Sequence, residues 1–345
     1  SLCAPVSAIA SSATKVIFPD RKYVQVSQNE RTKGVKHLVD STPNLVSLPS
    51  LYALPSPNCP KPATNTSIPV IDLSGLDGSD DQRRLLTIKE IGSACEEWGF
   101  FQVKNHGVRI SLMEEMVKAV EEFFNLPFEE KNKYASNDVM DPVRYGTGLN
   151  TPAKHTPLLL LHVARKYLEE VYALALTLAG AISESLGLNK DYIEISLGQG
   201  CQIVANNYYP PCPEPDRTLG ITPHSDHGGL TILVQNDVDG LQIKHGEDWV
   251  AVRHVPGTFV VNLGDYLEHR GVVNKEKTRI SIAVGHGPEQ TATVAPAAPL
   301  IGDKGRAQFT PIMYKDYMKI QQSSVVRGKT PLESILINGD TMSAV

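Results

Sequence analysis

Two histidines and an aspartate stand just ahead of a strand-like run in the segment TPHSDHGGLTILVQ, residues 222–235. In an extended segment, residues two apart point the same way, so His224 and Asp226 can offer an imidazole nitrogen and a carboxylate oxygen to one metal ion. A His-x-Asp tripeptide alone is weak support, because surface histidines and aspartates are usually just solvated. A metal site therefore needs a third ligand from another part of the chain.

His269, in the segment LEHRGVVN, is the best candidate for that ligand because it directly precedes another β-branched run. Two histidines and one carboxylate on one face, with other positions open, suit non-haem iron(II) and oxygen chemistry. An ordinary surface residue between strands is the alternative interpretation of His269. The remaining histidines that could replace it fall outside any matching pattern: His227, His245, His254 and His286.

The segment TRISIAV carries a second constellation. On a strand, Arg279 and Ser281 face one way, so a guanidinium and a hydroxyl are presented together. A planar fork of donors suits a carboxylate held by two parallel hydrogen bonds, although an ordinary edge-strand arginine is the alternative. In NNYYPPCP, Asn207 and Tyr209 also lie two apart and could donate to the same acid, or the tyrosine could pack in the core.

These residues need a scaffold of short strands. Six strand candidates separated by Gly, Pro and Asp follow residue 198: QIVANNYY, LTILVQ, GLQIKH, DWVAVR, TFVVNL and RISIAVG. Before them, apolar spacing predicts helices over residues 88–98, over MVKAVEEFFNL after a capping box at Ser111, and over residues 163–186. IPVIDLS and FFQVKNHGV read as strands, and PIMYKDYMKIQQ reads as a last helix. This order predicts a mostly β core with flanking helices, an α+β jelly roll.

Three regions follow from these patterns. Residues 1–65, rich in Ser, Pro and Asn, form a partly disordered lead-in. Residues 66–190 form an N-terminal helical region, and residues 191–345 form the jelly-roll core with its C-terminal helix.

Composition excludes several classes of partner. Among 345 residues the net charge is -5 and the basic residues are scattered, so nucleic acid is an unfavourable partner. No run approaches the roughly twenty apolar residues of a membrane span. The N-terminus lacks the basic head of a signal peptide. Five cysteines without CxxC spacing fit reduced thiols, which predicts a cytoplasmic protein. The absence of a long apolar run predicts that it has no membrane partner.

Together these segments resemble the plant 2-oxoglutarate- and iron(II)-dependent dioxygenases of specialised and hormone metabolism. The matching segments run from about residue 68 to residue 285: PVIDLS, EEWGFFQVKNHGV, FFNLPFEEKNKY, NNYYPPCPEP, HSDHGGLTILVQNDVDGLQI, FVVNLGD and HRGVVNKEKTRISIA. The resemblance implies a double-stranded β-helix with the metal at its open end.

The resemblance also implies roles for particular residues. His224, Asp226 and His269 would bind Fe(II), Arg279 and Ser281 would hold the far carboxylate of 2-oxoglutarate, and Tyr209 with Asn207 would add further contacts to this co-substrate. With O2, and with ascorbate as a candidate reductant, the co-substrate would yield succinate and carbon dioxide. A flavonoid, phenolic, alkaloid or hormone would be hydroxylated, desaturated or demethylated. Weak candidates for lining the substrate pocket are Tyr145, Phe128 and Met313, for which core packing is the alternative.

Two departures from the family pattern fall at functional places. About ten residues of a turn and strand that relatives carry are absent between Glu268 and His269, more than a loop adjustment explains. A pocket-walling segment is also short after Thr156. These gaps predict that His269 can miss the metal. The alternative is that the chain is a catalytically impaired member of the family, or that its sequence comes from a faulty gene model lacking the strand before His269, so that it is a binding protein at most. A zinc hydrolase is a third reading, disfavoured because Arg279 and Ser281 have no role there.

Overall fold

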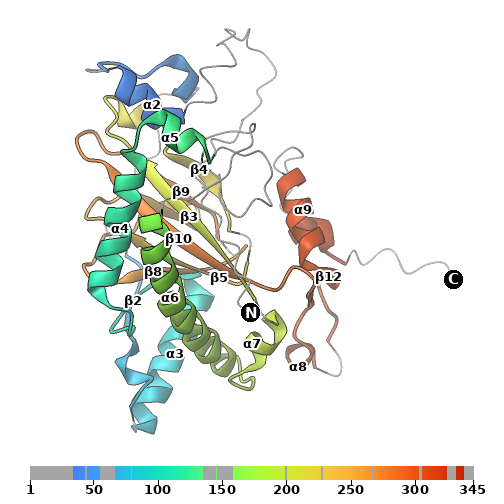
Figure 1. The fold of residues 1–345 in the computed structure, drawn as a ribbon. Coiled ribbons are helices and arrows are strands. Elements are labelled where there is room, and N and C mark those ends of the chain that lie inside the picture. Colours follow the sequence, from blue (N-terminus) through green and yellow to red (C-terminus); the bar gives the residue numbers. More distant parts are fainter. Residues whose placement is uncertain are drawn as a thin grey trace, which may run out of the picture.

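Two β-sheets packed face to face form the centre of the computed structural model, and long helices cover one of them (Figure 1). The structure describes residues 34–42, 45–54, 67–78, 80–134, 145, 158–198, 200–226, 228–265, 267–302, 305–324 and 332–337. The first 33 residues, His227 and residues 146–157, which lead to the shortened segment, lie outside this described part.

The larger sheet has six strands in the order β1 (Val70–Asp72), β2 (Phe100–Lys104), β8 (Phe259–Leu263), β5 (Leu230–Gln235), β10 (Arg279–Gly287) and β3 (Cys201–Tyr209). Its strands are antiparallel except for the β1–β2 pair. The smaller sheet is antiparallel, in the order β4 (Ile221–His224), β9 (His269–Gly271), β6 (Leu241–His245) and β7 (Asp248–Ala251). A separate pair joins β11 (Thr293–Val294) to β12 (Ile312–Met313). This arrangement confirms the predicted jelly roll.

Three long helices lie along the larger sheet: α3 (Asp81–Glu97), α4 (Ile110–Phe124) and α6 (Leu158–Ser185). Shorter helices are α2 (Gly34–Ser41), α5 (Phe128–Asn132), α7 (Tyr192–Leu197), α8 (Ala298–Ile301) and α9 (Tyr314–Ser324). Four 3-10 turns complete the described elements: η1 (Ser50–Tyr52), η2 (Leu73–Gly75), η3 (Pro215–Arg217) and η4 (Leu332–Ile335). Helix α2 falls in the region expected to be a lead-in.

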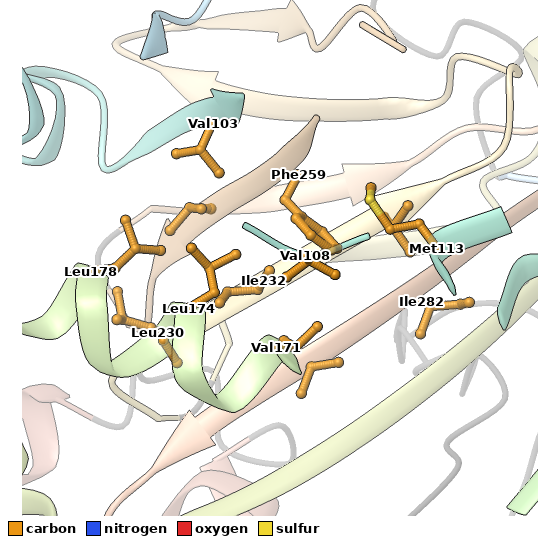
Figure 2. Packing of buried hydrophobic residues seen from close by; sticks show 14 of the residues in the cluster. Val103, Val108, Met113, Val171, Leu174, Leu178, Leu230, Ile232, Phe259 and Ile282 are labelled. Carbon is orange, nitrogen blue, oxygen red and sulfur yellow. The ribbon is translucent and has the colours of Figure 1, made fainter. Parts of the chain in front are cut away.

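The apolar stripe of α6 forms the centre of the larger core (Figure 2). Val171, Leu174 and Leu178 recur every three to four residues and are buried against the sheet, where Ile232 and Ile282 face them. Full burial of each such side chain stabilises the fold by about 1.5–3 kcal/mol. A second cluster lies between the two sheets and includes Phe100, Leu241, Ile243, Val250 and Val260. The sandwich is therefore packed on both faces of its larger sheet.

The start of α4 corrects one prediction. Ser111 does not cap the helix, which begins at Ile110 with Arg109 in the capping position and no side-chain cap. Instead the backbone N–H and the Nε of Arg109 donate to Glu170 of α6, at 3.0 and 2.7 Å. A tertiary ion pair thus takes the place of the local capping box, and the capping position lies two residues earlier than predicted.

Two other boundaries differ from the predictions. Helix α3 begins at Asp81, not near residue 88, because the carboxylate of Asp80 accepts from the backbone N–H of Gln82 and Arg83 at 3.0 and 3.2 Å. The predicted tail helix begins at Tyr314, because the two preceding residues pair as β12 with β11.

His286, near the end of β10, should make the stability of the fold decrease at acidic pH. Its Nδ1 lies 3.2 Å from the Val284 carbonyl and its Nε2 lies 2.9 Å from the amide nitrogen of Gln202, which fits a neutral ring that donates through Nδ1 and accepts through Nε2. Burial lowers its pKa from 6.5 to about 4. Between pH 6.5 and pH 4, His286 is protonated in the unfolded chain but stays neutral in the folded chain. The free energy of unfolding therefore decreases by up to about 1.4 kcal/mol for each pH unit by which the pH falls.

Urea unfolding of the metal-free protein at pH 7 and pH 5 measures this dependence. His286→Gln should show a smaller loss of unfolding free energy between the two pH values than the parent chain, whereas His254→Gln should lose as much as the parent. Equal losses in all three proteins would show that His286 does not carry the effect.

Candidate active site

The pairing of two strands brings the predicted metal ligands together. His269 on β9 lies directly opposite His224 on β4, and its other neighbour is Ile243 on β6. Only residues 264–268 connect β8 to β9, yet the backbone pairing on both sides still fixes His269. The expectation that the short connection displaces His269 is therefore wrong.

The ligand atoms of the three side chains converge. Asp226 Oδ1 lies 3.8 Å from His224 Nε2 and 3.5 Å from His269 Nε2. All three atoms lie within 4.8 Å of one another, and within the described ranges no other cluster of three His, Cys, Asp or Glu is this close. Two imidazoles and a carboxylate with open positions are the donor set of non-haem iron(II) sites.

Neighbouring groups orient these ligands. The Nδ1 of His224 lies 2.7 Å from the carbonyl oxygen of Thr222, and donation there leaves the Nε2 lone pair for a metal. The Nδ2 of Asn262 donates to Asp226 Oδ2 at 3.0 Å, which leaves Oδ1 facing the histidines. The ring of His269 stands edge-on to Phe100, with centroids 5.4 Å apart. Each ligand is therefore held by a contact beyond the cluster.

The charge state of Asp226 also fits a metal. Burial would raise the pKa of this carboxyl, but the adjacent His269 and His224 and the hydrogen bond from Asn262 outweigh burial and hold the pKa well below its usual range. The carboxylate is thus ionised, which is the form that binds cations.

Asn262, which the sequence analysis did not single out, carries a prediction. Asn262→Leu frees the Oδ2 of Asp226 to rotate, so Fe(II) affinity should fall about 10- to 100-fold in anaerobic titration. Asn206→Leu is the matched control, because Asn206 is also buried in the larger sheet but lies on β3, which β5 and β10 separate from the strand of Asn262. Equal Fe(II) affinities in the two variants would contradict this role.

A cradle of donors lies on β3 and β10. The register pairs Arg279 with Tyr209 and Ser281 with Asn207, so the four predicted side chains share one face. Arg279 donates through Nη1 to Ser281 Oγ at 3.4 Å, and Asn207 Nδ2 lies 3.5 Å from the same oxygen. The guanidinium carbon lies 5.1 Å from the centre of the Tyr209 ring.

Arg279 is a buried cation that has no carboxylate partner among the described residues. Its side chain is 2% exposed. Its Nη2 donates to Gln235 Oε1 at 2.9 Å, while its Nε has no hydrogen-bond partner in the described structure. Burial lowers the pKa of the guanidinium, and the Tyr209 side chain opposes that effect. An unpaired buried charge is costly, so a ligand carboxylate would satisfy this cradle. Gln235 is a contributor that the sequence analysis missed.

The metal cluster and the cradle adjoin. Tyr209 Oη lies 3.4 Å from the position that a Cβ would take on Gly271, which is two residues beyond His269 on β9. One small ligand could therefore contact both the metal cluster and the cradle.

The three predicted lining residues have other contacts. The backbone N–H of Tyr145 donates to the Tyr134 carbonyl at 2.7 Å, and its ring packs near Phe123 within the core cluster beside the helices. Phe128 begins α5, with its ring 4.6 Å from that of His37. Met313 pairs with Thr293. For these three residues a lining role stays a prediction.

Comparisons with known proteins decide the family. Residues 68–176 match the model of the N-terminal domain of a non-haem dioxygenase in morphine synthesis, and residues 200–288 match the 2OG-Fe(II) oxygenase superfamily. The rice protein 2-oxoglutarate-dependent dioxygenase 19 (Oryza sativa subsp. japonica) is 39% identical over 304 residues, covering 78% of this chain and 90% of the rice protein. The chain belongs to the plant 2OG-Fe(II) oxygenase family.

Two further proteins that are similar to this chain carry names that refer to different small molecules. Oxoglutarate-dependent flavonoid 7-O-demethylase 1 of Ocimum basilicum is 35% identical over 308 residues, which is 79% of this chain and 82% of that protein. The crystal structure of JOX2 in complex with 2OG, Fe and JA superposes with a TM-score of 0.74 at 30% identity, over 88% of this chain and 97% of JOX2. Sequence resemblance and jelly-roll fold are thereby confirmed, while the boundaries at residues 65 and 190 stay a prediction.

No helix among the described residues is both long and apolar enough to cross a membrane.

Proposed function

We propose that this oxygenase binds Fe(II) through His224, Asp226 and His269 and couples the oxidative decarboxylation of 2-oxoglutarate to the oxidation of a small plant metabolite. The proposal is carried by the buried guanidinium of Arg279, which has no carboxylate partner among the described residues and shares its cradle with Tyr209, a neighbour of β9. A zinc hydrolase would use a similar ligand set but would leave this cation without a purpose.

When bound, iron supplies the activation of dioxygen. The chain's own residues supply position. The two Nε2 atoms and Asp226 Oδ1 would hold the ion. Arg279 offers a planar fork to the far carboxylate of 2-oxoglutarate, and the Ser281 hydroxyl can donate to the same group. These contacts would anchor the co-substrate at its far carboxylate.

Apolar side chains wall the His269 side of this site. Phe100 and Ile243 flank His269 and belong to the apolar cluster between the sheets. This low-dielectric wall would strengthen the interaction between His269 and an ion.

The substrate class rests on the family. A flavonoid demethylase and a JA-binding oxygenase are similar to this chain to comparable degrees, so overall similarity does not select one substrate. A flavonoid, phenolic, alkaloid or hormone fits the family, and hydroxylation, desaturation and demethylation stay open. A cytoplasmic location and a role for ascorbate as reductant stay predictions.

Within the described residues, Cys95, Cys201 and Cys212 are free thiols.

Succinate formation tests the proposal. Purified protein with Fe(II), O2 and 2-oxoglutarate should form succinate slowly without a metabolite and faster with an accepted one. Omission of Fe(II), O2 or 2-oxoglutarate should stop succinate formation. Folded protein that turns over 2-oxoglutarate under no condition would favour the catalytically impaired alternative. Turnover of a substrate without 2-oxoglutarate would favour hydrolysis.

A further inference from the structure

Asp265, in the turn after β8, has an unusual backbone conformation. Its φ is 54°, and apart from Asn105 it is the only non-glycine residue with a positive φ in the described ranges. Aspartate tolerates the left-handed region better than most other non-glycine residues, and its surroundings fix the conformation here. The contacts of Asp265 therefore indicate what the turn is built to hold.

The turn packs on the backbone that carries a metal ligand. The Asp265 N–H donates to the Asp226 carbonyl at 2.7 Å, and Asp265 Oδ1 accepts from the Ser225 hydroxyl at 3.2 Å. The preceding Gly264 N–H donates to the Gly229 carbonyl at 3.2 Å. A Cβ at Gly264 would lie 3.1 Å from the Asp226 carbonyl oxygen and would collide with that of Gly228, so only glycine allows this approach.

The second oxygen of Asp265 reaches the C-terminal helix. Tyr317 on α9 donates its hydroxyl to Asp265 Oδ2 at 2.6 Å, across 52 residues of sequence. Tyr317 is buried, at 7% exposure. Burial and the adjacent carboxylate raise its pKa, so the phenol stays protonated and remains a donor. Short O–H···O⁻ bonds of this kind are about twice as strong as neutral ones.

We propose that Tyr317 is a positioning residue that acts through Asp265 to hold the segment carrying Asp226 in its metal-binding geometry. This inference rests on the proposed function, because it assigns the C-terminal helix a part in the same metal site. Asp265 contacts Ser225 and the backbone of Asp226 but contributes no ligand atom to the cluster. Loss of the Tyr317 bond should therefore weaken metal binding rather than abolish it.

Tyr317→Phe and Tyr314→Phe make a matched pair of variants. Both tyrosines are buried on α9, but the Tyr314 hydroxyl has no hydrogen-bond partner in the described structure. Anaerobic titration should show Fe(II) affinity about 10- to 100-fold weaker in Tyr317→Phe and unchanged in Tyr314→Phe. Asp265→Asn tolerates the positive φ and weakens the same bond. Combined with Tyr317→Phe, it should add less than its own separate loss, because the Tyr317 bond is already gone and the Ser225 contact of Asp265 is left to change.

Urea unfolding of the metal-free variants confirms that each is folded before titration. If folded Tyr317→Phe binds Fe(II) as tightly as the parent, the inference is overturned while the proposed function stands. If the two losses in the double variant simply add, the Tyr317–Asp265 pathway is likewise overturned. If the folded parent itself binds no Fe(II), the proposed function fails, and this inference fails with it.

Discussion

His269→Ala is expected to lower Fe(II) affinity by at least about 100-fold and to remove succinate formation. Loss of a group that only orients a ligand already costs about 10- to 100-fold, and His269 supplies one of three ligand atoms. Its position depends on backbone pairing with β4 and β6, which the alanine variant retains. The variant should therefore fold while losing the metal, and anaerobic Fe(II) titration measures the loss.

His254→Ala is the control for this variant. His254 lies outside the metal cluster. Its backbone N–H donates to Asp239 at 2.7 Å. The control should bind Fe(II) like the parent chain. Unchanged affinity in His269→Ala would mean that another group completes the site and that the short connection between β8 and β9 has cost the chain this ligand.

Arg279→Leu has the second large expected effect, and it acts on the co-substrate. Removing one partner of a buried ion pair costs about 3–5 kcal/mol, so the dissociation constant for 2-oxoglutarate should rise at least about 100-fold. Arg279→Lys keeps the charge but not the planar fork, and it should fall between the parent and the leucine variant. Titration of 2-oxoglutarate into the Fe(II) form measures both.

Stability separates this role from a structural one. The ligand-free parent buries a guanidinium that has no carboxylate partner among the described residues, so Arg279→Leu should unfold at an equal or higher urea concentration. Arg253→Leu, which removes an exposed partner of Asp239, should leave 2-oxoglutarate binding unchanged. Marked destabilisation together with unchanged co-substrate affinity would assign Arg279 to the core.

Local sequence pattern predicted most of the scaffold and both constellations. The alternation in RISIAVG and NNYY placed Arg279, Ser281, Asn207 and Tyr209 on shared faces, and the observed register pairs them directly. Strand identity needs only a few neighbouring residues, and a period of two fixes which side chains share a face.

Residues whose role depends on register between distant strands were not predictable in this way. Asn262 and Gln235 lie in apolar runs, and they reach Asp226 and Arg279 only because β8, β5 and β10 are neighbours in the larger sheet. Likewise, no local signal shows that Glu170 replaces a capping box at Arg109. The reach of His269 across a short connection is also set by pairing on both sides of β9.

The most direct test of the proposed site is an anaerobic visible spectrum of the metal-free protein titrated with Fe(II) and then with 2-oxoglutarate. Chelation of iron by the 2-oxo acid produces a charge-transfer band without any knowledge of the main substrate. We predict that the band appears in the parent and is lost in His269→Ala and Arg279→Leu. Absence of the band in parent protein that is shown to be folded would contradict the assembly of an iron and 2-oxoglutarate site in this chain.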